Sequence, residues 1–164
     1  MKRRIRMKSL VVLLAILILT APAFSATVEV LETGSEVVNL NPEETMVWFD
    51  ITTIVAAGAT QVFKLRIPIS KGYIRDATWN SASDNCTIGF YESEALATAA
   101  DIPRLEFTVD TYKYSPDTRK RSFANRDDAK CIYMRLYNGA GAISTGAGTD
   151  NATSVILTVG EQKR

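Results

Sequence analysis

The chain of 164 residues contains no histidine. Imidazole is the general base of Ser-His-Asp and Cys-His catalysis, a common metal ligand, and the side chain that titrates near neutral pH. A chain without it lacks all of these devices. The sequence therefore excludes the common hydrolase triads, histidine-ligated metal centres and histidine pH switches.

Other signatures of catalysis are also missing. No glycine-rich loop follows a strand and opens a helix, as phosphate-binding loops do. Glycosidases need only two carboxylates, about 5–10 Å apart, but a chain with 18 Asp and Glu residues holds such pairs by chance. We therefore expect a protein that is not an enzyme and uses no cofactor. A carboxylate-based hydrolase is an alternative.

Long apolar runs are absent after residue 25. Before it, residues 1–25 combine five basic residues up to Lys8, an apolar run from Leu10 to Leu19, and the small-residue exit Ala23-Phe24-Ser25. This order is typical of a secretory signal peptide cut before Ala26. Its apolar core is about ten residues long, too short for a membrane span of roughly 20. We expect export by the secretory route to the periplasm, the cell surface or the extracellular space, with no membrane span.

Excess positive charge is absent once the signal peptide is removed. Residues 26–164 carry 14 Lys and Arg and 18 Asp and Glu residues, a net charge of −4. The basic run Arg119-Lys120-Arg121 is offset by nearby aspartates. Nucleic acids and anionic membrane surfaces attract clustered cations. The charge balance therefore predicts no nucleic-acid partner.

Cysteine is scarce, with only Cys86 and Cys131. In an exported protein we predict a disulfide between them, closing a loop of about 45 residues and worth roughly 4 kcal/mol. Strand parity complicates this bridge, because Cys86 shares a face with buried residues and Cys131 does not. Two separate buried thiols are the alternative. Two thiols without histidine do not form a zinc site, and we expect no bound metal.

Apolar and polar residues alternate over most of residues 26–164, which is typical of half-buried strands. Residues 45–53 and 61–67 alternate in this way around Ala57-Gly58-Ala59, and we predict that they pair as an antiparallel hairpin. Further strands are expected at residues 27–31, 37–40, 73–79, 86–92, 105–109, 121–125, 131–137 and 155–159.

This pattern predicts one all-β domain, residues 26–164. We expect a single antiparallel β-sandwich of jelly-roll or immunoglobulin-like type, with about eight to ten strands. Only Ser93 to Ala100 is expected to be helical, over one or two turns. Residues 138–153 are rich in Gly, Ala, Ser and Thr, and they predict a long mobile loop.

One group of side chains suggests a binding surface. Strand parity places aromatic and cationic residues together, away from the apolar face. Such a face binds proteins through hot-spot residues or stacks on sugar rings, unless a slip of one residue turns the rings into the core. The group consists of Trp48, Lys64, Arg66, Tyr133, Arg135 and Tyr137.

An exported all-strand domain with two cysteines resembles a chaperone–usher pilin, with residues 27–30 in the place of the alternating donor strand. The first cysteine lies about 60 residues after Ala26, later than in pilins. The ending Gly160 to Arg164 also lacks their apolar alternation and penultimate tyrosine. The resemblance covers no specific motif, and no family is assigned.

The leading hypothesis is an exported, non-catalytic β-sandwich that works through protein contacts as a surface or assembly subunit. Its partner is then another protein or a second copy of the chain. A carbohydrate-binding module with an aromatic sheet face is the alternative, in which case the partner is a glycan.

Overall fold

The computed structural model describes residues 26–40, 43–81, 83, 85–109, 121–124, 130–146 and 153–161. The predicted signal peptide, residues 1–25, lies outside this part of the chain. The described residues form ten strands and one short helix, as the period-two pattern predicts. The elements are β1 (Val28–Val30), β2 (Gly34–Leu40), β3 (Glu43–Ile51), β4 (Thr60–Arg66), β5 (Lys71–Asn80), β6 (Cys86–Tyr91), α2 (Glu94–Ala99), β7 (Leu105–Val109), β8 (Arg121–Ala124), β9 (Cys131–Asn138) and β10 (Thr153–Glu161).

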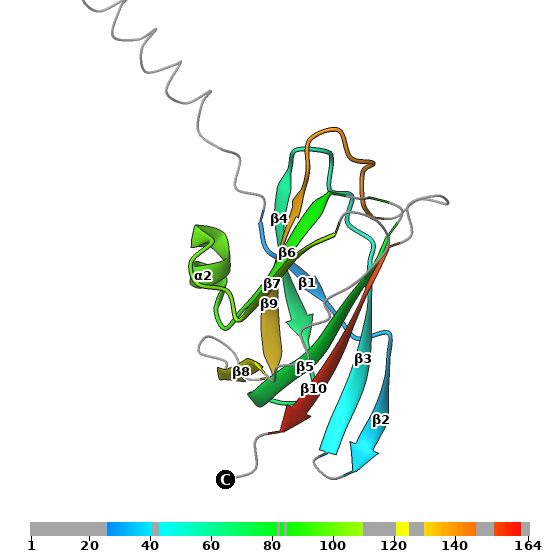
Figure 1. Cartoon of the computed structure of the whole chain (residues 1–164), viewed down its shortest axis with the longest axis vertical. Helices are drawn as coiled ribbons and strands as arrows, with labels where there is room; N and C mark the ends of the chain where they lie inside the picture. The colour runs from blue at the N-terminus through cyan, green and yellow to red at the C-terminus, as the bar shows by residue number, and fades with distance from the viewer. Residues whose placement is uncertain are drawn as a thin grey trace, which may run out of the picture.

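The strands form two five-stranded sheets that face each other in a sandwich-like arrangement (Figure 1). Sheet A has the order β1-β4-β9-β6-β7, and sheet B has the order β2-β3-β10-β5-β8. Every pairing is antiparallel except that of β1 with β4, which is parallel. The chain therefore crosses repeatedly between the sheets.

The predicted hairpin between residues 45–53 and 61–67 is wrong. Strand β3 lies in sheet B between β2 and β10, whereas β4 lies in sheet A between β1 and β9. Both strands carry a continuous apolar face, and these faces contribute to the same core from opposite sheets. Residues 52–59 connect the sheets, and Gly58 at φ 75° donates its backbone N–H to the carbonyl of Asn138 at 2.7 Å.

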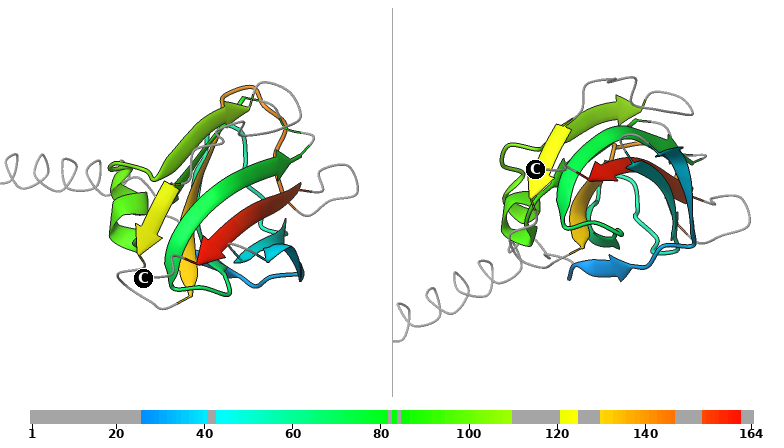
Figure 2. Two further views of the ribbon diagram at one scale, coloured as in Figure 1. Left: turned by 60° about the horizontal axis from the view of Figure 1, so that its bottom comes forward. Right: turned by 90° about the horizontal axis from the view of Figure 1, so that it is seen from below.

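One hydrophobic core lies between the sheets. Alternate residues of nearly every strand point into it, and Figure 2 shows the strands curving around this shared interior. Its largest fully buried members are Trp79, Phe49, Phe63, Phe90, Ile51, Leu65, Ile74, Ile88, Ile132, Met134 and Leu136. The remaining alternate residues of each strand point outward, where their side chains can contact a partner.

Helix α2 covers part of the outer face of sheet A. The side chain of Ser93 caps its first turn by accepting the backbone N–H of Leu96 at 3.3 Å, and Ala100 ends it in the left-handed conformation. The bounds agree with the predicted helix at residues 93–100. Ala97 and Leu96 pack on a second, smaller cluster of Val62, Tyr91, Cys131 and Tyr133.

The predicted disulfide is wrong, because both cysteines are free and buried. Cys86 belongs to the core between the sheets, and Cys131 belongs to the cluster beneath α2 on the outer face. Cys86 pairs with Asn138, which lies seven residues along β9 from Cys131, so the Cα atoms of the two cysteines are about 23 Å apart. Disulfides need Cα atoms within roughly 7 Å. Strand parity, which places the two cysteines on opposite faces of sheet A, therefore prevents the bridge.

Buried polar contacts surround Cys86 instead. The Asn138 side chain is fully buried, and its oxygen accepts from Cys86 Sγ at 3.2 Å and from Ser83 Oγ at 3.0 Å. Its amide nitrogen donates to the carbonyls of Val55 at 2.9 Å and Ile143 at 3.1 Å. Asn138 thus holds the beginning of the segment predicted to be a mobile loop, whose residues 147–152 lie outside the described part.

Two free thiols make a direct prediction for the purified protein. Alkylation of the unfolded chain without any reductant should label both cysteines, as read by intact mass. The thermal midpoint of the native protein should not change when a reductant is added, because no bridge worth roughly 4 kcal/mol is present to break. Thiols that react only after reduction would contradict this arrangement.

Candidate functional site

The six residues predicted to share one face lie on two different sheets. Trp48 is on the outer face of β3 in sheet B, where it pairs with Gly34 and Ile156. The other five lie on β4 and β9 in sheet A, where the register sets Lys64 opposite Tyr133. The six side chains therefore do not form one surface, and the two aromatic ends of the predicted platform face opposite sides of the molecule.

Helix α2 removes one more aromatic ring from the surface of sheet A. Tyr133 is only 2% exposed and packs in the cluster beneath α2. Tyr91, from the neighbouring strand β6, lies in the same cluster with its ring over Gly89, where a Cβ atom would come within 2.9 Å of it. Burial, together with the charge of Glu106, raises the pKa of the Tyr91 hydroxyl. Both tyrosines are therefore structural.

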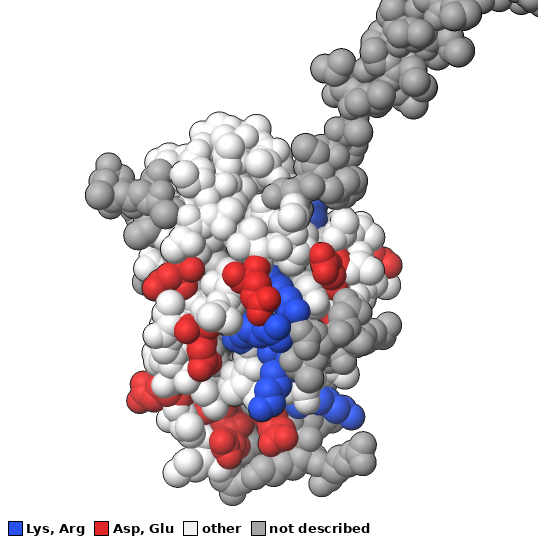
Figure 3. Space-filling view, turned by 180° about the vertical axis from the view of Figure 1, so that it is seen from behind, with Lys and Arg blue, Asp and Glu red and all other residues white. Residues whose placement is uncertain are grey.

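The remaining residues of the set form a charged strip on sheet A. Arg66 donates from Nε to Glu29 of the neighbouring strand β1 at 2.5 Å, and Tyr137 is 37% exposed. In Figure 3 most of the basic side chains in view lie close together below the middle of this face, with acidic side chains on both sides. The field of such a patch is local, because carboxylates border it.

A surface cavity of about 510 Å³ lies beside this strip. Arg66 is the one member of the predicted set that lines it. Leu31, Ile67 and Pro68 supply apolar walls, while Glu32 and Lys130 add one charge of each sign. The cavity thus joins the connection between β1 and β2 to the ends of β4 and β9.

The strongest surface feature is an exposed apolar edge that the sequence reasoning missed. Four of the eight large apolar side chains exposed in the described residues lie within residues 31–40, namely Leu31 (66%), Val37 (49%), Val38 (41%) and Leu40 (82%). Val37 and Leu40 pair with the side of β3 that faces inward, yet no part of sheet A covers them. The sequence does indicate this edge, because Val37, Val38 and Leu40 lie together in a segment that is otherwise polar.

The four sheet edges differ in how well they are protected. Strand β1 has three residues, β8 has four and β7 has five, whereas β2 has seven. Glu92 also guards β8, because its carboxylate accepts the backbone N–H of Ala124 at 2.7 Å while Arg104 holds its other oxygen at 2.7 Å. Short and capped edges resist pairing with other chains. Strand β2 has neither protection.

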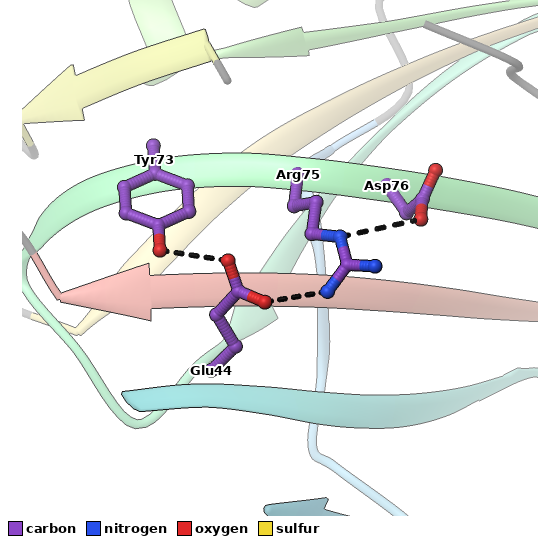
Figure 4. Close-up of polar contacts among 4 residues, drawn as sticks. All are labelled: Glu44, Tyr73, Arg75 and Asp76. Carbon is purple, nitrogen blue, oxygen red and sulfur yellow. Dashed lines mark hydrogen bonds and ion pairs between the residues drawn. The ribbon is translucent and has the colours of Figure 1, made fainter. Parts of the chain in front are cut away.

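A buried carboxylate holds the β2–β3 side of sheet B to β5 (Figure 4). Tyr73, Gly160 and Glu44 lie in one row across β5, β10 and β3. The Tyr73 ring crosses over Gly160, where any Cβ atom would collide with it, and its hydroxyl donates to Glu44 at 2.8 Å. Arg75 donates to the second oxygen of Glu44 at 2.5 Å. This clamp makes the base of the exposed edge rigid.

The environment of Glu44 favours its ionised form. Burial alone would raise its pKa, but hydrogen bonds from Tyr73 and Arg75, the charge of Arg75 and a hydrogen bond from Asn39 together hold the pKa below its usual value. The same contact raises the pKa of Arg75. Asn39 belongs to β2, so the Glu44 carboxylate on β3 contacts β2 on one side and reaches β5 across β10 on the other.

The described residues contain no group of three or more acidic or cysteine side chains that could hold a metal ion. Within the same ranges, no helix is long and apolar enough to cross a membrane.

The Glu44 clamp predicts a pH-dependent contribution to stability. Because the folded pKa of Glu44 lies below its ordinary value of about 4.5, the ionised group stabilises the fold above that pH, and the contribution is lost as the pH falls through the folded pKa. Glu44→Gln should therefore lower the free energy of unfolding at pH 7 by about 2 kcal/mol. In urea titrations, this difference should shrink towards pH 3.

Glu36→Gln is the matched control, since Glu36 is an exposed carboxylate on the neighbouring strand. Its effect at pH 7 should stay within about 0.5 kcal/mol. Equal effects of the two substitutions, or a difference between Glu44→Gln and the native chain that does not change with pH, would contradict the assigned role.

Comparison of the chain with protein-family models, curated proteins and solved structures finds no significant match.

Proposed function

We propose that this chain is an exported, non-catalytic protein that works through protein contacts, as a surface or assembly subunit. The observation that carries the proposal is the exposed apolar edge strand β2. Leu40 is 82% exposed, and Val37 and Val38 lie exposed on the same strand. Soluble proteins rarely expose grouped apolar side chains on a long edge strand unless that surface meets a partner.

The other three edge strands are shorter than β2, and β8 is also capped, which supports this proposal. The chain uses Glu92 and Arg104 to cap β8, and β1 is only three residues long. An unprotected edge at β2, in a molecule whose other edge strands are shorter, is best explained by binding of a partner there. The Glu44 clamp adds to this argument, because it holds β3, next to the open edge, in a fixed position.

The strand pairing supports a jelly roll within this proposal, in preference to an immunoglobulin-like sandwich. Strands β3 to β10 pair from the outside inwards, β3 with β10, β4 with β9, β5 with β8 and β6 with β7. A rolled eight-stranded hairpin has this pairing. Jelly rolls occur in viral capsid proteins and in lectins, so this fold is compatible with an assembly subunit and with a carbohydrate-binding module.

Export is part of the proposal and rests on the signal-peptide pattern of residues 1–25. Gln61 donates to the carbonyl of Ala26 at 2.8 Å, and Thr27 donates to Glu94 at 2.5 Å. The product should begin at Ala26 when it is recovered from the exporting cell.

The carbohydrate-binding alternative has less support. Glycan platforms place several rings on one face, where each can stack on a sugar ring. Here Trp48 and Tyr137 lie on different sheets, and Tyr133 is buried. Each exposed face therefore offers one ring of the predicted set.

Self-association of the chain beginning at Ala26 tests the proposed function. Light scattering after size exclusion and negative-stain microscopy should show multimers or fibres. The double substitution Val37→Lys/Leu40→Lys should shift the distribution to monomers, because it places charge on the open edge. Ile102→Lys changes an apolar residue that is 78% exposed elsewhere, and it should leave assembly unchanged.

A chain that stays monomeric and is retained on an insoluble glycan would overturn the proposal. In that case Trp48→Ala or Tyr137→Ala should weaken the retention, and the substitutions on β2 should not.

A further inference from the structure

We propose that edge strand β2 binds an extended, basic segment of a partner protein, which adds to sheet B as a sixth strand. This inference rests on the proposed function and names the kind of partner that it involves. Three observations carry it: the length and exposure of β2, the apolar side chains on one face of it, and the sign of the charge around it.

The edge is long enough and open enough for strand addition. Strand β2 has seven residues, and six of them are exposed. Its inner neighbour β3 satisfies one side of the strand, and nothing in the described part of the chain pairs with the other. Backbone hydrogen bonds give such an added strand its affinity, and alternate side chains give it specificity.

The apolar residues define one face of the added strand. Val37 and Leu40 pair with the inward parity of β3 but lie beyond the cover of sheet A. Apolar side chains at alternate positions of a partner strand would lie beside them and bury them. The register shift between Val37 and Asn39 places Val37 and Leu40 opposite residues of the same parity of β3, although they are three positions apart.

The charge around the edge selects a cationic partner. Residues 26–63 contain six Asp and Glu residues and no Lys or Arg. Glu44 is neutralised by Arg75, and Glu29 is paired with Arg66. Glu36 lies on β2 itself and Glu32 lies just before it, both exposed. Lys or Arg at the outward positions of the partner strand would face these carboxylates.

The same charge argues against a second copy of β2 as the occupant. Antiparallel pairing of two β2 strands would bring the acidic residues of one copy towards those of the other, and like charges across strands are destabilising. Strand β8 of another copy is also a poor occupant, because Glu92 already accepts the N–H of Ala124. The basic segment that pairs with β2 therefore comes from another protein, and multimers of this chain alone would join β2 to a different surface of the next copy, not to a second β2.

A blocked seven-residue peptide of alternating Lys and Val is the probe. Titrated into ¹⁵N-labelled chain beginning at Ala26, it should shift the amide signals of residues 31–40 first. Its affinity should fall as salt rises from about 0.05 to about 0.3 M, because exposed charges are screened over this range. The Glu/Val peptide of the same length should not bind. A Lys/Val peptide with a central proline keeps the charge but cannot pair fully, and it should bind far more weakly.

Charge reversal locates the contact. Glu32→Lys/Glu36→Lys should weaken binding of the Lys/Val peptide roughly tenfold, since two attractive exposed pairs become repulsive. Asp101→Lys/Glu106→Lys is the matched control, with the same change in net charge at exposed positions away from β2. It should reduce the affinity much less. All four positions are exposed, so the variants should fold, and their amide spectra will show it.

Three results would overturn the inference: signals that shift elsewhere than β2, equal binding of the acidic and basic peptides, or equal effects of the two double variants. Multimers that form without peptide binding at β2 would remove this inference and leave the proposed function standing. A glycan-binding monomer that ignores both peptides would remove the proposed function as well.

Discussion

The packing of two apolar sheet faces against each other is the constraint on which the rest of the molecule depends. Because side chains alternate along each strand, filling one core from both sheets leaves every second residue on the outside. The register then fixes which outward residues are neighbours. Cys86 and Cys131 lie on opposite faces of sheet A, and Trp48 and Tyr137 lie on the outer faces of different sheets. The surface chemistry of this protein is thus a consequence of how its core is filled.

The outer faces of the two sheets are stabilised by different contacts. On sheet A, helix α2 buries a second apolar cluster that includes Tyr91 and Tyr133. On sheet B, no described helix covers the strands, and a polar clamp centred on Glu44 ties β3 to β5 across Gly160. Burying a carboxylate is costly unless it is paired and hydrogen-bonded, and here Tyr73 and Arg75 meet that requirement. Each device stiffens one sheet, and the clamp also holds β2 through the hydrogen bond from Asn39 to Glu44.

Strand positions, the helix at residues 93–100 and the parity of both cysteines could be predicted from the sequence, because each depends on local alternation or a local cap. The sheet that each strand joins could not, since an inward apolar face looks the same in both sheets. That ambiguity produced the false hairpin and the mixed aromatic group. The Glu44 clamp could not be predicted either, because it needs Gly160, more than a hundred residues after Glu44, to leave space for the Tyr73 ring.

The acidic residues around β2 resolve an apparent conflict in this surface. A long apolar edge invites pairing with identical chains, and natural proteins suppress this with charges on the edge. Carboxylates do so here without closing the edge, because they repel an acidic copy and attract a basic strand. The net charge of residues 26–164 is therefore not evenly distributed: the first strands carry acidic residues alone, while Lys64, Arg66 and Arg135 lie on sheet A. The acidic residues therefore disfavour pairing of β2 with a second β2 and favour pairing with a basic strand of another protein.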